Sequence, residues 1–589
     1  MSSRRLLLVE TFLFLFAAAI IGRLFYWQVV KHESFQAVAK EQVESTVAIG
    51  AERGKILAAD GSVLASNQKA YLVYAILPEI RKLRGKDETE EEFIKKVVDS
   101  LTPILLEERF AGKGKVEQKD KDKARDEIKS NLVSQLQQPN LVWVPLAKKV
   151  DEATKQKIES LKIKGIGFED DTKRFYPEGN LAAGLLGFVG KDADGNDKGY
   201  FGLEGYYDKE LRGRPGRLIQ EVDALGRPIL AAPAEGLEAW DGSDLLTTID
   251  RTVQFIADKK LEEGVEKYGA RGGAIIVLDP KTGGVLASSS YPTFNLLDPT
   301  DSKPEDYRNL GISQIYEPGS TFKSITFSAA LDSGAISSQT ICPCEGPIKV
   351  AEYEIRTWNN KYHPNSTIAE ILQNSDNVGA GFAASKMGTD TFLKYIRNFG
   401  FGTSLQIDLQ GEEEGIVKER SDWSGVDLIT AAFGQGLSVT PLQMVNALAT
   451  IANGGKLMKP FVVKKIIGPK NEIEFKPKEI REVIKPSTAV LMKQLLLSAV
   501  EGGEGKKWIP LGYRVAGKTG TAQVPVGGRY SSNQAIASFV GFGPVEDPKF
   551  AAIVVLFQPS ASIWAVETAE PLFFQLAKEL YPYWGIPVQ

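Results

Sequence analysis

The chain begins with a long run of apolar residues. Residues 6–30 are apolar with few interruptions, and a helix of about 20 apolar residues spans a bilayer. Arg4 and Arg5 precede the run, where basic residues favour an N-terminus on the cytoplasmic side. The pattern predicts a cytoplasmic N-terminus over residues 1–5 and a transmembrane anchor over 6–30.

A cleaved signal peptide is the alternative interpretation of this run, with Ala17-Ala18-Ala19 as a small-residue cleavage site. The apolar residues nevertheless continue from Leu24 to Val30, which a signal peptide does not need. An uncleaved single-pass anchor is therefore favoured. Under both interpretations the chain beyond the run lies outside the cytoplasm.

The next part of the chain alternates short apolar runs with turn signals. Residues 52–67 predict two short strands joined at Asp60-Gly61, a dipeptide that tolerates positive φ. Residues 86–129 carry dense charge of both signs, which predicts a solvated helical region or a mobile insertion. The composition shifts over residues 231–244, where we expect a domain boundary.

The C-terminal part has the pattern of a sheet covered by helices. Two apolar runs flank residues 279–284, which predicts a hairpin. Helical patterns follow, and the chain then returns to strands before a closing helix over 569–584. This order predicts an α+β fold in which helices pack on a mainly antiparallel sheet, with the first and last elements in one layer.

Composition removes several kinds of chemistry. A net charge of −4 offers no surface suited to nucleic-acid phosphates. His32 and His363 are the only histidines, so a Ser-His-Asp hydrolase or a multi-histidine metal site has almost nothing to build on. Cys342 and Cys344 are too few for a metal cage and awkwardly spaced for a disulfide, so we interpret them as a turn or a reactive pair. We expect no metal and no cofactor, and any catalysis to use serine, lysine or carboxylates.

The segment YEPGSTFKS places Ser320 three residues before Lys323 at the start of a predicted helix. Ser320 could be an ordinary N-cap residue, but a capping box has an acid or amide three positions later, where this chain has a lysine. The helix dipole and a core position both disfavour the charged ammonium, which lowers the pKa of the lysine. Because residues i and i+3 share a helix face, a neutral amine there can activate the serine hydroxyl.

Two later motifs carry further chemistry, although each alone has an ordinary structural explanation. Ser375-Asp376-Asn377 follows a segment with a capping box at Thr367 and Glu370, which predicts a connection between two helices. Lys518-Thr519-Gly520 lies in a strand pattern. The glycine indicates a bulge or a close backbone approach, and the cation suits a peptide that adds to the strand edge and ends in a carboxylate.

Ser-x-x-Lys, Ser-Asp-Asn and Lys-Thr-Gly, in this order, resemble the motif set of penicillin-binding proteins and class A β-lactamases. RGKILAADGSVLASN, RFYPEGNLAAGLLGFVG and GLEGYYDKELRG are similar to the pedestal of class B penicillin-binding proteins, and GQGLSVTPLQMVNALATIANGG to their transpeptidase domain. Glu317-Pro318-Gly319 before the serine makes the chain most similar to the septal, or division, type.

The resemblance implies an α+β protein with a single transmembrane helix. An elongated, mainly β pedestal of the dimerisation type would occupy residues 31–235, with the charged insertion over 86–129. A transpeptidase domain would occupy residues 245–589. That domain would hold an antiparallel five-stranded sheet flanked by helices, together with an all-helical subdomain.

The resemblance also implies roles for the motif residues. Ser320 would attack the D-Ala–D-Ala carbonyl of a stem peptide and form an acyl-enzyme, with Lys323 as the base. Ser375 and Asn377 would pass the proton to the leaving D-Ala and hold the substrate amide, and Lys518 would support this network.

Substrate binding falls to the third motif in the same resemblance. Thr519, Gly520 and Thr521 would line the substrate site, and the two threonines would bind its terminal carboxylate and backbone. Backbone N–H groups of Ser320 and Thr521 would form the oxyanion hole. An amine from a neighbouring stem peptide would then take the acyl group, and β-lactams would acylate the same serine.

The implied partners are stem peptides of lipid-linked nascent glycan, β-lactam antibiotics, a SEDS-type glycosyltransferase and divisome membrane proteins, with no nucleic acid. The implied location is the bacterial cytoplasmic membrane, with the catalytic domain outside the cytoplasm. The alternatives are an elongation-type transpeptidase, a D,D-carboxypeptidase in which water takes the acyl group, and a non-catalytic divisome scaffold or β-lactam receptor. A class A β-lactamase would need neither the anchor nor the pedestal.

Overall fold

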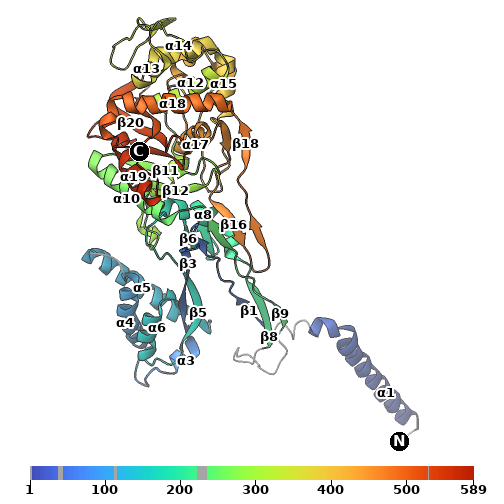
Figure 1. Ribbon diagram of the computed structural model, residues 1–589. Coiled ribbons are helices and arrows are strands. Elements are labelled where there is room, and N and C mark those ends of the chain that lie inside the picture. Colours follow the sequence, from blue (N-terminus) through green and yellow to red (C-terminus); the bar gives the residue numbers. More distant parts are fainter. Residues whose placement is uncertain (1–2, 37–43, 112–115, 222–234, 528, 589) are drawn as a thin grey trace. The chain divides into compact units, whose positions relative to one another are not determined.

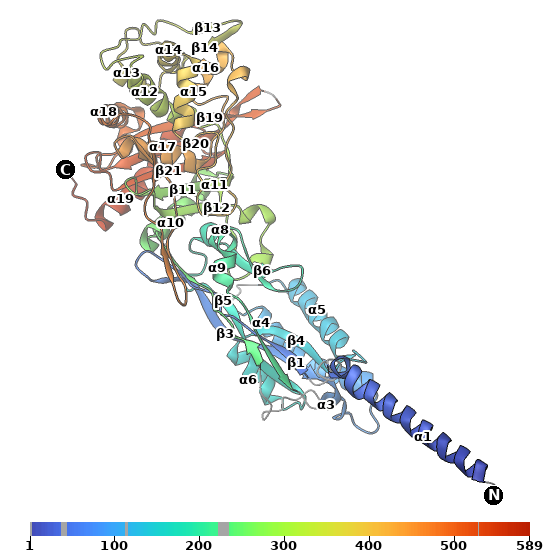
Figure 2. The same cartoon turned by 90° about the vertical axis from the view of Figure 1, so that its right-hand side faces the viewer.

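The computed structural model describes residues 3–36, 44–111, 116–221, 235–527 and 529–588 (Figures 1 and 2). The chain forms two compact units, one from residues 1–52 with 213–242 and one from 53–212 with 243–589. Residues 231–234 of the expected domain boundary lie outside the described residues. The change of unit at residues 242 and 243 falls within the rest of that segment.

The first unit contains the apolar N-terminal helix. α1 (Ser3–Phe25) continues into a π-helical turn, η1 (Tyr26–Val30), and the described side chains of both are exposed. Among the described residues, Arg4–Val30 is the one helix long and apolar enough to cross a membrane. The predicted anchor is therefore a single exposed apolar helix. The unit also holds the antiparallel strands β1 (Glu44–Ile49), β8 (Gly216–Glu221) and β9 (Glu235–Leu237).

The second unit includes a sheet built around the long strand β3 (Val63–Ile76). The predicted hairpin is present, because β2 (Ile56–Leu57) pairs antiparallel with β3 around Gly61, whose φ is +84°. The sheet order is β17-β16-β10-β2-β3-β4, and β5 also pairs with β3. These other strands are β4 (Trp143–Val150), β5 (Ile166–Phe175), β10 (Asp244–Thr247), β16 (Val463–Ile467) and β17 (Glu472–Glu474).

The charged segment 86–129 forms helices, as expected, but one face of them is buried. α4 (Glu90–Arg109) begins with a capping box at Thr89 and Glu92, and α5 (Gln118–Leu136) packs against it. Apolar residues of both helices join those of β3, β4 and α6 (Glu152–Ser160) in a core of their own. Residues 112–115 lie outside the described residues. The segment is therefore packed against the sheet around β3 rather than fully solvated.

Short elements complete this part of the unit. α3 (Leu77–Arg81) contributes to the same apolar core. After β5 follow α7 (Ala183–Leu186), β6 (Phe188–Lys191), β7 (Asp197–Tyr200), α8 (Gly202–Tyr206) and α9 (Asp208–Arg212). Glu204 of α8 is fully buried and accepts hydrogen bonds from Arg53 Nε at 2.7 Å and Arg174 Nε at 2.6 Å. This ionic cluster ties three distant segments of the chain together.

The second unit also contains a five-stranded antiparallel sheet in the order β12-β11-β21-β20-β19. Its first hairpin pairs with the last strand, as the sequence predicts, since β11 pairs with β21. The strands are β11 (Gly272–Leu278), β12 (Val285–Tyr291), β19 (Ala516–Val526), β20 (Arg529–Gly543) and β21 (Phe550–Phe557). β19 is an edge strand.

Helices cover this sheet and extend beyond it. α10 (Arg251–Tyr268) and α19 (Ala569–Tyr583) share one apolar core with the sheet, and α17 (Pro441–Ala452) packs in the other. Figure 1 shows α12, α13, α14 and α15 gathered beyond the sheet. The remaining helices are α11 (Leu310–Ser313), α12 (Lys323–Asp332), α13 (Ile368–Gln373), α14 (Asn377–Met387), α15 (Thr389–Asn398), α16 (Gly425–Ala431) and α18 (Pro486–Gly502). Three two-stranded sheets pair β6 with β7, β13 (Ile348–Val350) with β14 (Tyr353–Ile355), and β15 (Lys456–Met458) with β18 (Glu479–Glu482).

The two cysteines correct one expectation. Cys342 and Cys344 form a disulfide bond, with Cα atoms 5.3 Å apart, although their spacing had suggested a turn or a reactive pair. Cys344 adopts a φ of +44°, so the backbone turns back on itself around Pro343 and brings the two sulfurs together. Both cysteines are buried. The pair is therefore a buried disulfide rather than two free thiols.

Candidate active site

Ser320 lies in a tight turn ahead of the buried helix α12. The turn, η4 (Gly319–Phe322), is fixed because the Gly319 N–H donates to the carbonyl of Gly434 at 3.0 Å. A Cβ on Gly434 would lie 2.2 Å from the Gly319 carbonyl oxygen, so only glycine permits this approach. The N-cap residue of α12 is Phe322. Ser320 therefore does not cap the helix, and its half-buried hydroxyl is available for other chemistry.

Lys323 is the first residue of α12, and its side chain is fully buried. Its Nζ lies 3.0 Å from Ser320 Oγ and 3.3 Å from Ser375 Oγ. Nζ also donates to the Ser375 carbonyl at 2.5 Å and to Asn377 Oδ1 at 2.8 Å. The structure thus brings together four of the residues that the sequence motifs single out, three of them around one amine.

The surroundings of Lys323 favour the neutral amine. Burial, together with the nearby charge of Lys518, holds the pKa of Lys323 well below its usual range, and Asp376 opposes this only weakly. A neutral amine has two N–H bonds and one lone pair. If the Ser375 carbonyl and Asn377 Oδ1 take the two N–H groups, the lone pair remains for the hydroxyl of Ser320. This is the arrangement of a base beside its nucleophile.

The Ser375–Asn377 motif lies between two helices, as predicted. α13 begins with the expected capping box at Thr367 and Glu370. Asp376 caps α14, since its side chain accepts from the N–H of Val378 at 2.7 Å. Ser375 has a φ of +50°, in the left-handed region that non-glycine residues rarely adopt. This strained turn directs both Ser375 and Asn377 at Lys323.

The edge strand β19 forms the opposite wall of the site. A Cβ on Gly520 would lie 2.7 Å from the Pro318 carbonyl oxygen and 2.8 Å from Thr321 Cγ2. The glycine therefore marks a close backbone approach between β19 and the Ser320 turn, one of the two explanations that the sequence offered. Thr521 Oγ1 accepts from the N–H of Ala565 at 3.1 Å. Beside the serine, β19 leaves an edge to which an extended peptide can add.

Lys518 is almost fully buried at the start of this wall, with 4% of its surface exposed. Its Nζ donates to Thr519 Oγ1 at 3.1 Å. Burial lowers the pKa of Lys518 to about 8, while the charges of Glu570 and Glu504 act in the opposite direction. The ammonium therefore persists at neutral pH, where it can attract a substrate carboxylate.

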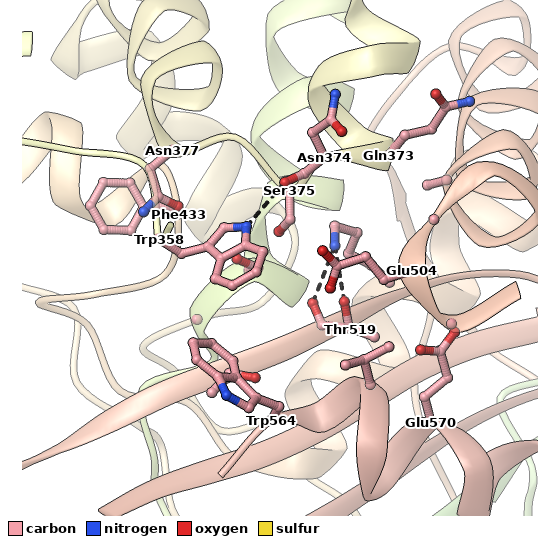
Figure 3. Close-up of a pocket in the computed structure, with 18 of the residues that line it drawn as sticks. Trp358, Gln373, Asn374, Ser375, Asn377, Phe433, Glu504, Thr519, Trp564 and Glu570 are labelled. Carbon is pink, nitrogen blue, oxygen red and sulfur yellow. Dashed lines mark hydrogen bonds between the residues drawn. The ribbon is translucent and has the colours of Figure 1, made fainter. Parts of the chain in front are cut away.

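A cavity of about 390 Å³ joins these groups. Ser320, Ser375, Asn377, Lys518, Thr519 and Thr521 line it, whereas Lys323 and Gly520 lie behind its walls. Trp358 and Trp564 reach into it from two different connections (Figure 3), with ring centroids 5.1 Å apart. The Trp358 indole donates to the Asn374 carbonyl at 3.3 Å.

Sequence reasoning missed many residues of this cavity, among them Trp358, Trp564, Glu504 and Glu570. Trp358 and Trp564 are both partly exposed, at 42% and 38%, and exposed tryptophans are an unused signal of a binding surface. Glu570 lines the cavity from the first turn of α19 and is 3% exposed. Its position within the apolar closing helix was the only available signal.

Two family descriptions match the chain. "Penicillin binding protein transpeptidase domain" matches residues 273–578, which is more than half of the 589 residues. "Penicillin-binding Protein dimerisation domain" matches residues 48–247.

Similar proteins extend over most of the chain. Stage V sporulation protein D of Bacillus subtilis (strain 168) is 32% identical over 589 residues, covering 99% of this chain and 86% of the relative. Peptidoglycan D,D-transpeptidase FtsI of Escherichia coli (strain K12) is 32% identical over 424 residues, covering 71% and 68%. The crystal structure of Penicillin Binding Protein 2X from Streptococcus thermophilus is 27% identical, with a TM-score of 0.71 over 92% of this chain and 80% of that chain. These matches confirm the resemblance and the α+β architecture inferred from the motifs, and the chain belongs to the class B penicillin-binding proteins.

Proposed function

We propose that the chain is a peptidoglycan D,D-transpeptidase that cross-links stem peptides through a serine acyl-enzyme. The observation that carries this proposal is the 3.0 Å approach of the buried Lys323 amine to Ser320 Oγ, beside the edge strand β19. A desolvated amine next to a hydroxyl is an activated nucleophile. The printed name of the Escherichia coli relative, a peptidoglycan D,D-transpeptidase, supports the same activity.

In the first half-reaction, Ser320 Oγ attacks the carbonyl carbon of the D-Ala–D-Ala bond and Lys323 takes its proton. The C–N bond then breaks, and the proton passes by way of Ser375 to the leaving D-Ala. The Ser375 hydroxyl lies 3.3 Å from Nζ, within reach for this transfer. Backbone N–H groups of Ser320 and Thr521 stabilise the oxyanion, a contribution of about 3 kcal/mol per donor.

Substrate binding in this proposal uses the edge strand. The terminal carboxylate lies against Thr519 and Thr521, close to the Lys518 ammonium, and the backbone of the stem peptide adds along β19 past Gly520. In the second half-reaction an amine of a neighbouring stem peptide attacks the acyl carbon and gives one proton to Lys323. The C–Oγ bond to Ser320 breaks, and the serine regains a proton from Lys323.

Labelling of the detergent-solubilised chain with a fluorescent β-lactam tests the acyl-enzyme. We expect a covalent adduct that persists for hours in the wild type and is missing from Ser320→Ala. Release of D-Ala from a stem-peptide donor, with transfer to an added amine, then tests the transpeptidase. A short-lived adduct would favour a hydrolase instead, and no adduct in a folded wild type would contradict the proposal.

We also propose that the catalytic part lies outside the cytoplasm, on a single-pass anchor in the bacterial cytoplasmic membrane. The apolar helix Arg4–Val30 supports the anchor. The Cys342–Cys344 disulfide supports the location, because disulfides persist in oxidising compartments. The division into a pedestal over 31–235 and a transpeptidase domain over 245–589 is supported by the matched family spans. Accessibility of the chain to an external protease in spheroplasts tests the orientation.

For the cellular role, we propose septal wall synthesis with a SEDS-type glycosyltransferase and divisome proteins as partners. The Glu317-Pro318-Gly319 resemblance supports it, and Glu317 is tied into the site region by the Gly436 N–H, which donates to Oε1 at 3.0 Å. Depletion of the protein separates the alternatives. Filamentous cells with blocked septa are the expected result, whereas rounded cells would favour the elongation type.

A further inference from the structure

The active-site cavity extends beyond Lys518 to an acidic end. Glu504 and Glu570 line it there, and both interact electrostatically with Lys518. Gln523 lines the cavity farther along β19, about 17 Å from Lys518 for five residues of extended strand. Figure 3 shows Glu504 and Glu570 on one side of Thr519, and Trp358 and Phe433 toward the other. The cavity therefore has two chemically different ends.

Glu570 is a buried carboxylate, one oxygen of which has no hydrogen-bond partner in the described part of the chain. Its side chain is 97% buried, and among the described residues Oε2 accepts no hydrogen bond. Lys518, the cation that acts on it through space, makes its hydrogen bonds to Thr519 instead. A Cβ on Gly505 would lie 1.9 Å from Glu570 Oε2, so the glycine leaves room for the carboxylate in its present position.

Keeping such a carboxylate is energetically unfavourable unless a ligand compensates it. Burial is the main cause that raises the pKa of Glu570 to about 7, so its ionised form lacks sufficient compensation. An approaching cation would stabilise the ionised form and offset this penalty. Glu504 is exposed at the rim of the same end and adds a second negative charge. This end of the cavity is thus complementary to a cationic group.

We propose that the cavity end between Glu504 and Glu570 is the subsite for the ammonium group of the acceptor, the amine that takes the acyl group from Ser320. The proposal rests on the transpeptidase function above. When D-Ala leaves, it vacates the space beside Thr519. This space is continuous with the cavity end lined by Glu504 and Glu570. The ammonium loses one proton to water, and the amine forms the C–N bond with the acyl carbon. The C–Oγ bond breaks, and the second proton of the amine returns to Ser320 through Lys323.

Acyl transfer to two nucleophiles of different charge tests the subsite. The detergent-solubilised chain is acylated with a thioester mimic of the D-Ala–D-Ala donor, and either glycinamide, a cation at neutral pH, or neutral hydroxylamine is added. We expect Glu570→Gln and Glu504→Gln to raise KM for glycinamide about tenfold each, the size expected for a lost charged hydrogen bond. KM for hydroxylamine should change much less. Glu504 is exposed, so its variant folds even if the Glu570 variant does not.

Glu567→Gln is the matched control, because Glu567 is exposed and lies outside the cavity lining. Equal losses with both nucleophiles, together with slower labelling by a fluorescent β-lactam, would make Glu570 a counter-ion of Lys518 and overturn the subsite. Unchanged KM values for glycinamide in both variants would also overturn it. If the wild type forms no acyl-enzyme at all, the proposed function fails first, and the labelling shows this directly.

Discussion

Asn377 Oδ1 lies 2.8 Å from Lys323 Nζ and accepts a hydrogen bond from it. At the other end of the same amide, Asn377 Nδ2 donates to the Arg356 carbonyl at 3.1 Å. The second bond fixes which end of the amide faces the lysine. An oxygen there takes one N–H of the neutral amine, as the Ser375 carbonyl takes the other. The lone pair of Lys323 is thereby left for Ser320, and the amide orientation decides whether the lysine can act as a base.

Asn377→Asp should therefore impair acylation without a change of shape. A carboxylate at this position favours the charged ammonium and raises the pKa of Lys323, by about 1 to 3 units for a neighbouring opposite charge. The rate of acylation by a fluorescent β-lactam should fall at neutral pH and recover partly as the pH increases. Asn359→Asp is the control, since its Oδ1 accepts from the Lys361 N–H away from the cavity. An unchanged pH profile would show that Lys323 is not the base.

The charge of Lys518 predicts an alkaline limit to activity. Its pKa, lowered by burial to about 8, means that the ammonium is present below about pH 8 and lost above it. Acylation by carboxylate-bearing substrates should decline above that pH. It should also decline at low pH, where Lys323 becomes protonated, which gives a bell-shaped profile. Lys518→Arg keeps its charge at all these pH values, so the alkaline decline should disappear. Its persistence in the variant would assign the decline to another group.

Gly520→Ala should push strand β19 away from the turn that carries Ser320. The added methyl would lie 2.7 Å from the Pro318 carbonyl oxygen and 2.8 Å from Ser538 Oγ, so β19 or the Ser320 turn must move. A displacement of about 1 Å costs on the order of 100-fold in rate. We expect slower β-lactam acylation with Tm lowered by only a few degrees. Gly346→Ala is the matched control, because a Cβ there meets no atom within 4 Å. Equal acylation rates in the two variants would contradict the close approach.

Local signals predicted the catalytic sheet and the motif residues well. The hairpin around residues 279–284, the capping box at Thr367 and the glycine in the third motif each depend on near neighbours in the chain, which a single sequence displays. The pairing of β16 with β10, more than 200 positions apart, was not predictable, because it depends on tertiary contacts alone. The Cys342–Cys344 bond was missed for a similar reason, since it requires a left-handed residue.

The site residues that the sequence analysis missed also depend on tertiary contacts. Glu570 lies in the apolar pattern of the closing helix and reads as a polar position on its surface. Only the folded chain brings it beside Lys518, whose segment lies about fifty residues earlier. Trp358 and Trp564 come from two connections whose conformation no periodic pattern specifies. Cavity walls built from distant loops are therefore the part of a site that sequence patterns reveal least.

The buried cluster of Glu204, Arg53 and Arg174 lies outside the active-site cavity, and its loss should lower the free energy of unfolding without removing activity. Glu204→Ala would leave two buried guanidinium groups without their shared carboxylate, and breaking a buried ion pair from one side costs about 3 to 5 kcal/mol. The midpoint of urea unfolding, followed by tryptophan fluorescence, should fall clearly. β-Lactam acylation at low temperature should persist, because the cluster lines no part of the cavity.

The exposed pair Lys465–Glu472 provides the comparison for this experiment. Glu472→Ala removes a carboxylate from a pair that water already solvates, so the cost is expected to stay below about 1 kcal/mol. The difference between the two variants measures the extra cost of losing a buried carboxylate shared by two arginines over losing a solvated one that contacts a single lysine. If both shift the urea midpoint equally, the Glu204 cluster contributes no more than a surface ion pair. The close packing of the three segments around residue 204 would then have to come from apolar contacts alone.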